Sequence, residues 1–136
     1  MTSSPSRQRT VLVVDDYEAQ RYAMSRLLQQ AGFAVLVAGT GEESLARARQ
    51  HPDVILLDVG LPDMTGFEVC RRLKANPEPA EAPVVFVSGT YMSPDDVVQG
   101  EKVGGCCFLF HPVSVDHLLV VIEGALAKAA HQKPVP

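Results

Sequence analysis

The sequence predicts an α/β fold in which helices cover both faces of a parallel sheet. Five short apolar segments alternate strictly with five segments that carry helical spacing or helix-capping signals. The apolar segments are hydrophobic almost throughout, as expected for strands that are buried on both faces. Strand–helix pairs in strict alternation imply right-handed crossovers between parallel strands.

The expected strands end at turn residues or at helix-start signals. They are Thr10–Val14, Phe33–Val37, Val54–Asp58, Val84–Val87 with Ser88 at its end, and Cys106–Phe110. Val54–Asp58 places four branched apolar residues before a lone carboxylate. Gly60 and Pro62 then turn the chain. A lone aspartate at this place is also typical of a helix cap or a turn.

The expected helices cover residues 17–31, 42–50, 65–75, 93 to about 103, and a last segment that Ser114 caps. Ser93 and Pro94 are start signals for the fourth helix, Gly100 weakens it, and Thr65 or Asp63 can cap the third. The expected inward residues are Ala19, Ala23, Leu27 and Ala31 with Met24 and Leu28 beside them; Phe67, Cys70 and Leu73; and Val115, Leu118, Leu119, Ile122 and Leu126.

Length and composition indicate a single domain of ordinary soluble type. The chain has 136 residues, of which 46% are hydrophobic and 21% charged, and a net charge of -4. We therefore expect no direct nucleic-acid binding, and no apolar run predicts a membrane span or a signal peptide. The three cysteines cannot all pair within one chain, which favours reduced thiols and a cytoplasmic location. Residues 1–9 are expected to form a flexible arm, 10–130 the domain, 76–83 a Pro-rich loop within it, and 131–136 a tail or linker.

Polar residues that could form a site follow four of the strands. They are Asp15 and Asp16, Asp58, Ser88 and His111. The carboxyl ends of parallel strands share one edge, so these residues should converge there. Three carboxylates that meet repel one another, and a hard divalent cation compensates them; Mg²⁺ fits best, with Mn²⁺ as an alternative. Taken singly, each of these residues could instead be a helix cap or a turn residue.

These motifs resemble the receiver domain of two-component response regulators, as in the stand-alone chemotaxis regulator. The resemblance covers roughly Thr10 to Ala130. Its motifs are Asp15-Asp16, Asp58 with Leu61-Pro62-Asp63 and Gly66, Ser88-Gly89, and Gly104 to Pro112. It implies a flavodoxin-like, three-layer, doubly wound (βα)5 fold with strand order 2-1-3-4-5.

The resemblance also implies residue roles. Asp58 would accept a phosphoryl group from a histidine kinase or a phosphotransfer protein in a Mg²⁺-dependent reaction. Asp16 would bind the ion directly and Asp15 through water, while Asp58 and the Gly60 carbonyl would complete the protein ligands. The Ser88 hydroxyl would hydrogen-bond the phosphoryl group, and Phe108 holds the position of the aromatic switch residue.

The expected activity is phosphorelay signalling, not enzymatic turnover. The domain would catalyse its own phosphorylation, and the added charge would alter the surface of the fourth helix, fifth strand and fifth helix. That surface would bind an effector protein, serve a fused effector domain, or form a homodimer. The chain either works alone or belongs to a longer protein.

Four positions depart from the family pattern. His111 stands where the family has a lysine, and an imidazole is shorter and only partly charged near neutral pH. This substitution affects the expected switching more than the expected phosphorylation. Phe108 stands where the family often has tyrosine, which favours an inward ring. Cys106 and Cys107 replace a more polar pair; we expect packing to be their role, with redox sensing as the alternative.

Two other functions fit part of the pattern. A pseudo-receiver would bind partners without phosphate, and His111 is the residue that favours it. A Mg²⁺-dependent phosphohydrolase would use Asp58 as its nucleophile, but the sequence offers neither a general acid near Asp58 nor a substrate cap.

Overall fold

The computed structural model describes residues 8–75, 82–89 and 92–132. Residues 1–7 of the expected arm, 76–81 of the Pro-rich loop and 133–136 of the expected tail lie outside the described residues. The strands are β1 (Thr10–Val14), β2 (Ala34–Ala38), β3 (Val54–Asp58), β4 (Val84–Ser88) and β5 (Gly105–Phe110). The helices are α1 (Glu18–Gln30), α2 (Gly41–Ala48), α3 (Gly66–Ala75), α4 (Pro94–Lys102) and α5 (Val115–Gln132).

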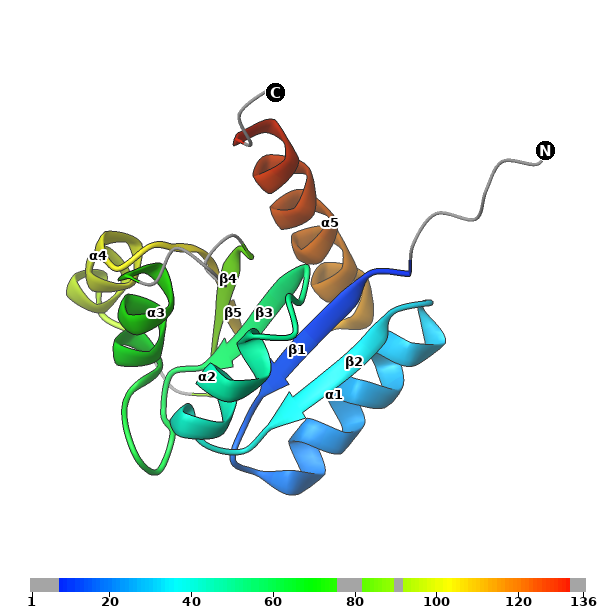
Figure 1. Cartoon of the computed structure of the whole chain (residues 1–136), viewed down its shortest axis with the longest axis horizontal. Helices are drawn as coiled ribbons and strands as arrows, with labels where there is room; N and C mark the ends of the chain where they lie inside the picture. The colour runs from blue at the N-terminus through cyan, green and yellow to red at the C-terminus, as the bar shows by residue number, and fades with distance from the viewer. Residues whose placement is uncertain (1–7, 76–81, 90–91, 133–136) are drawn as a thin grey trace.

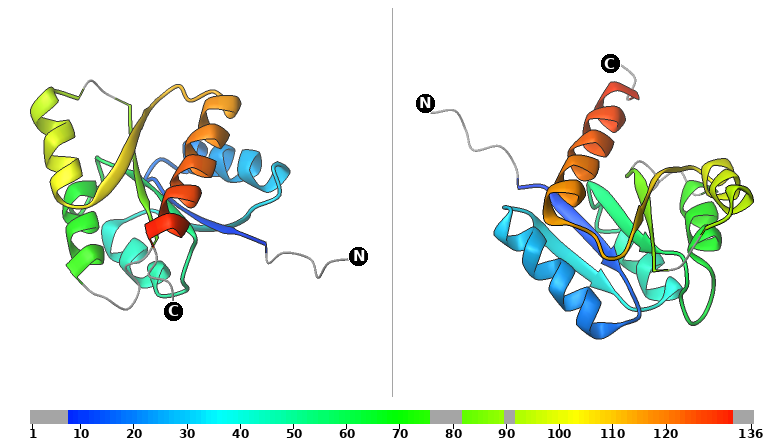
Figure 2. Two further views of the ribbon diagram at one scale, coloured as in Figure 1. Left: turned by 90° about the horizontal axis from the view of Figure 1, so that it is seen from above. Right: turned by 180° about the vertical axis from the view of Figure 1, so that it is seen from behind.

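The five strands form one parallel sheet in the order β2-β1-β3-β4-β5, which confirms the expected topology. Helices α1 and α5 cover one face of the sheet, and α2, α3 and α4 cover the other (Figure 1 and Figure 2). Most predicted boundaries lie within one residue of the observed ones, the usual spread for element ends. Helix α2 is shorter than expected at its C-terminal end, and α5 continues to Gln132, into the segment expected as a tail.

Each face of the sheet has its own apolar core. Under α1 and α5, Leu28, Leu118 and Ile122 pack with buried residues of the strands. Under the other three helices, Phe67 and Leu73 of α3 belong to a second cluster. Because both faces are covered, the central strands are buried along almost their whole length.

The inward face of α1 differs from the predicted one. Met24, Ser25 and Leu28 are buried, and Leu27 is half-buried. The alanines of the predicted stripe, Ala19, Ala23 and Ala31, are exposed. The longer side chains bury more apolar area than alanine methyl groups, so the helix turns Met24 and Leu28 toward the sheet.

The predicted inner face of α5 is correct except at its first residue. Leu118, Ile122 and Leu126 are buried, and Leu119 packs against the same core. Val115 is 41% exposed, because residues 114–117 of the first turn all face solvent. Ser114 caps this helix as expected, since its hydroxyl accepts a hydrogen bond from the His117 N–H at 3.1 Å.

Gly100 lets α4 approach three aromatic rings. Phe86 contacts Phe67 edge-on at 5.0 Å and Phe108 at 5.2 Å between ring centroids. A Cβ atom at Gly100 would overlap the Phe108 ring and crowd the other two. Gly100, which the sequence predicts to weaken α4, is therefore required for the close packing of this helix against the rings. Ser93 and Asp96 form the capping box that begins the same helix.

Candidate functional site

Three aspartates meet at the carboxyl edge of the sheet. Asp15 and Asp16 follow β1, and Asp58 ends β3. Val14 pairs with Leu57 in the parallel register, so the ends of the two strands lie side by side. One carboxylate oxygen from each aspartate lies within 4.8 Å of the others. The predicted convergence of these three side chains is confirmed.

Short hydrogen bonds orient the two inner carboxylates. Asp15 is buried, and its Oδ1 accepts the Tyr17 N–H at 2.9 Å. Asp58 accepts the Gly60 N–H at 3.0 Å. Asp15 thus holds the turn before α1 and does not cap the helix, whose N-cap is Tyr17. Asp16 is exposed and faces solvent at the same edge.

The electrostatics of the cluster indicate uncompensated negative charge. Burial, together with the negative charges of the neighbouring Asp15 and Asp16, raises the pKa of Asp58 to about 6, although the hydrogen bond from the Gly60 N–H opposes the shift. A bound cation would offset the repulsion among these carboxylates. Three hard oxygen donors beside open solvent fit Mg²⁺, which binds few carboxylates and keeps several waters. The Gly60 carbonyl as a further ligand stays a prediction.

The loop from β3 to α3 fixes Asp58 closely. The Gly66 N–H donates to the Val59 carbonyl at 2.8 Å. A Cβ atom at Gly66 would overlap the Asp58 carbonyl oxygen, so only glycine allows α3 to begin this close to the strand end. Thr65 caps α3, because its hydroxyl accepts the Glu68 N–H at 3.1 Å.

Asp63 has a role that the sequence did not indicate. Its carboxylate accepts the N–H groups of Gly41 and Glu42 at 2.8 and 3.0 Å, at the beginning of α2. These two hydrogen bonds lower the pKa of Asp63. Asp63 does not cap the helix that follows it, as one prediction had it, but ties the β3–α3 loop to α2. No sequence signal pairs residues so far apart.

Ser88 and His111 continue the row of strand ends beyond Asp58. Asp58 pairs with Val87, and Ser88 pairs with Phe110. The His111 N–H donates to the Ser88 carbonyl at 2.9 Å. The order along the edge is therefore the aspartates, then buried Ser88, then half-buried His111. The Phe108 ring lies against Phe86 and is half-buried, which agrees with the expected inward placement.

Arg21 is a second residue that sequence reasoning missed. Its guanidinium donates to the Asp15 backbone carbonyl at 2.7 Å. A Cβ atom at Gly39 would approach the same guanidinium. Arg21 therefore joins α1 to the turns after β1 and β2, close to the acidic cluster.

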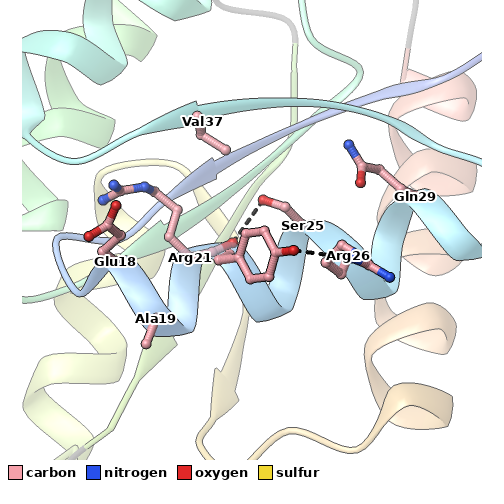
Figure 3. Close-up of a pocket in the computed structure, with 8 residues that line it drawn as sticks. Glu18, Ala19, Arg21, Ser25, Arg26, Gln29 and Val37 are labelled. Atoms are coloured by element: carbon pink, nitrogen blue, oxygen red, sulfur yellow. Dashed lines mark hydrogen bonds between the residues drawn. The ribbon is translucent and has the colours of Figure 1, made fainter.

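A groove of about 520 Å³ runs along α1 beside Val37 of the edge strand β2 (Figure 3). Within it Ser25 donates to the Arg21 carbonyl at 2.8 Å, and Arg26 donates to the Tyr22 hydroxyl at 3.1 Å. None of the three aspartates lines this groove. The chemistry of the site therefore lies at the sheet edge and not in the groove.

Within the part of the chain that the structure describes, no helix is long and apolar enough to cross a membrane.

Comparison with known proteins identifies the family. Residues 11–123 match the family model described as the response regulator receiver domain. The chain belongs to this family. It is a receiver domain of two-component signalling with a CheY-like fold.

Two relatives of this receiver domain match it over nearly their whole length. Protein PilH of Pseudomonas aeruginosa is 36% identical over 118 residues, which are 86% of this chain and 97% of PilH. The polar-differentiation response regulator DivK of Brucella ovis is 32% identical over 123 residues, which are 89% of this chain and 98% of DivK. The crystal structure of a CheY-like receiver domain protein from Methanospirillum hungatei has a TM-score of 0.84 at 27% identity and covers 93% of this chain and 100% of that one.

Proposed function

We propose that this receiver domain accepts a phosphoryl group on Asp58 from a phosphohistidine of a partner kinase or phosphotransfer protein. The supporting observation is the cluster of three carboxylates, in which Asp58 lies beside Asp15 and Asp16. An Asp58 oxygen attacks the phosphorus, the phosphorus–nitrogen bond breaks, and the imidazole leaves with the bonding electrons. The product is an acyl phosphate on Asp58.

Each residue of the site has a part in this transfer. Asp15 and Asp16 would hold Mg²⁺ together with Asp58, and the bound ion would neutralise charge on the phosphoryl oxygens. The hydrogen bond from the Gly60 N–H holds one Asp58 oxygen, which leaves the other to attack. The Ser88 hydroxyl is proposed to hydrogen-bond the transferred group. The domain thereby catalyses its own modification and is not a turnover enzyme.

The proposed output is a change at the surface of α4, β5 and α5. Ser88 pairs with Phe110 on β5, and the Phe108 ring packs beneath α4, so a movement of Ser88 can reach both elements. Exposed apolar side chains on this surface, Val98, Phe110, Val115 and Val120, suit a protein partner. We infer an effector protein, a fused effector domain or a second copy of this domain as the partner. A cytoplasmic location stays a prediction.

A pseudo-receiver remains the second candidate, because His111 stands at the family's lysine position. It predicts the same partner surface but no effect of phosphate. The conformational response to acetyl phosphate, compared with labelling of the same protein, separates the two functions, because a pseudo-receiver would show no response.

The proposal is tested by labelling the protein with acetyl phosphate in the presence and absence of Mg²⁺. We expect Mg²⁺-dependent incorporation of one phosphoryl group, detected by intact mass, and its loss in Asp58→Asn. Asp95→Asn is the matched control, since it changes an exposed aspartate of α4 that lies outside the cluster. Labelling of Asp58→Asn at the wild-type level, or no labelling of the wild type, would contradict the proposal.

A further inference from the structure

The side chains of Cys106 and Cys107 lie on the same face of β5. Val84 pairs with Gly105 and Val85 with Cys107, so Cys106 is an extra residue at a β-bulge. Neighbouring residues of a regular strand point to opposite faces, but a bulge interrupts this alternation. Both cysteines pack against the core under α5. Their sulfur atoms lie 3.3 Å apart.

The surroundings of the pair favour one thiolate beside one thiol. The hydrogen bond between the two sulfur atoms, aided by the positive charges of Lys128 and Lys74, lowers the pKa of Cys106 against the effect of burial. The same hydrogen bond, together with burial, raises the pKa of Cys107. Both side chains are half-buried and so can be reached by small oxidants.

Cys70 provides an internal comparison. It is fully buried, and its sulfur donates to the Val103 carbonyl at 3.4 Å. Burial raises the pKa of Cys70 to about 11. Its low accessibility and small thiolate fraction at neutral pH make it a poor nucleophile.

We propose that Cys106 and Cys107 form a redox site, which a peroxide oxidises to a disulfide between the two adjacent residues. The Cys106 thiolate attacks one peroxide oxygen, the oxygen–oxygen bond breaks, and the other oxygen leaves as water after protonation. The Cys107 sulfur then attacks the resulting sulfenic acid, its thiol proton goes to the leaving hydroxide, and a second water departs. Two thiols and one hydrogen peroxide thus give one disulfide and two water molecules.

The disulfide would be easily reversed by a dithiol reductant. Adjacent Cα atoms across a trans peptide are about 3.8 Å apart, shorter than the roughly 4.4–6.8 Å found in most disulfides. Such a bond is strained, and strained disulfides are the readily reduced, regulatory ones. The bulge is the part of β5 whose pairing is already irregular, so closure distorts the fewest ladder hydrogen bonds there. This site requires no phosphorylation.

The test treats the reduced full-length chain with hydrogen peroxide and follows intact mass and free thiols. We expect the monomer to lose two hydrogen atoms, dithiothreitol to restore them, and Cys70 to stay free. Oxidation of the pair should be at least about tenfold faster than that of Cys70, given the difference in thiolate content and burial. The matched variant Cys70→Ala should behave like the wild type, whereas Cys106→Ser and Cys107→Ser should not form the internal bond.

A second measurement does not depend on the stability of any variant. Tryptic mapping of the oxidised wild type should give the peptide that contains Cys106 and Cys107 without alkylation and lighter by two hydrogen atoms. Disulfide-linked dimers, a bond that involves Cys70, or oxidation of both thiols to separate acids would overturn the proposal.

Discussion

Replacing Asp58 by asparagine should stabilise the metal-free protein at neutral pH. The neutral amide would remove one charge from a cluster in which three carboxylates lie within 4.8 Å of one another. The asparagine Oδ1 can still accept the Gly60 N–H that Asp58 accepts at 3.0 Å. The substitution therefore relieves repulsion without loss of the local hydrogen bond.

The size of the effect follows from the pKa of Asp58, which rises from 3.8 to about 6 in the folded protein. Such a shift corresponds to at most about 3 kcal/mol, and solvent screening of this partly exposed side chain reduces it to roughly 1–2 kcal/mol. Because its pKa is higher in the folded state, Asp58 binds a proton more tightly there than in the unfolded chain. The stabilisation of the wild type that this protonation gives is complete below pH 3.8. It is lost as the pH rises through about 6, so wild type and variant should differ most above that pH.

Urea unfolding in the presence of a chelator, over a pH series, measures the difference. Glu101→Gln is the control, because it removes one negative charge from an exposed position of α4. Added Mg²⁺ should then stabilise the wild type more than Asp58→Asn, since binding to the folded state alone raises the free energy of unfolding. The reasoning is refuted if Asp58→Asn is no more stable than the wild type at neutral pH, or if its advantage persists unchanged in acid.

Four further substitutions test three separate features. Gly100→Ala should lower the free energy of unfolding by about 1 kcal/mol, because overlap with the aromatic rings outweighs the gain in helix propensity. Gly124→Ala is its matched control: a Cβ atom there meets nothing within 4 Å, so the free energy of unfolding should rise by about 1 kcal/mol. Asp63→Asn should lower the free energy of unfolding, measured with urea at neutral pH, because the lowered pKa of Asp63 means that its ionised carboxylate stabilises the fold. The difference between the variant and the wild type should shrink in acid, below the ordinary range of carboxyl pKa values, as Asp63 becomes protonated. His111→Lys should make the conformational response to acetyl phosphate, read by amide NMR shifts, stronger and less dependent on pH; equal responses in both proteins would contradict this.

The location of the acidic cluster was predictable because each aspartate stands at the carboxyl end of an expected parallel strand. Asp15, Asp16 and Asp58 each follow an apolar run, and parallel strands place all such ends at one edge of the sheet. Ser88 and His111 take neighbouring places on that edge for the same reason. Which of these residues are neighbours on the edge follows from the strand order, and the family resemblance supplied that order.

Features that depend on contacts between distant segments were not predictable. Asp63 caps α2 from a loop more than twenty residues away, and Gly100 matters because of three rings on other elements. The predicted buried face of α1 was correct at Met24 and Leu28 but wrong at its three alanines, because spacing alone cannot rank alanines against larger residues that compete for the sheet. The bulge at Cys106 was missed because a strand with one extra residue reads like a regular one.

The position of His111 separates what phosphorylation needs from what switching needs. In the proposed transfer to Asp58, the cluster at the ends of β1 and β3 would hold the cation, and no residue of β5 takes part. The phosphorylated site carries roughly -1.5 to -2 charge on the new group, beside Asp15 and Asp16, and one divalent ion cannot neutralise all of it. The remaining charge must be met from the β4–β5 side, where the His111 N–H is bonded to the Ser88 carbonyl. A lysine there would bring a long-reaching, fixed positive charge to the phosphoryl group, whereas the imidazole of a histidine is shorter. We therefore expect phosphate to couple to the α4–β5–α5 surface more weakly with His111 than it would with a lysine at this position.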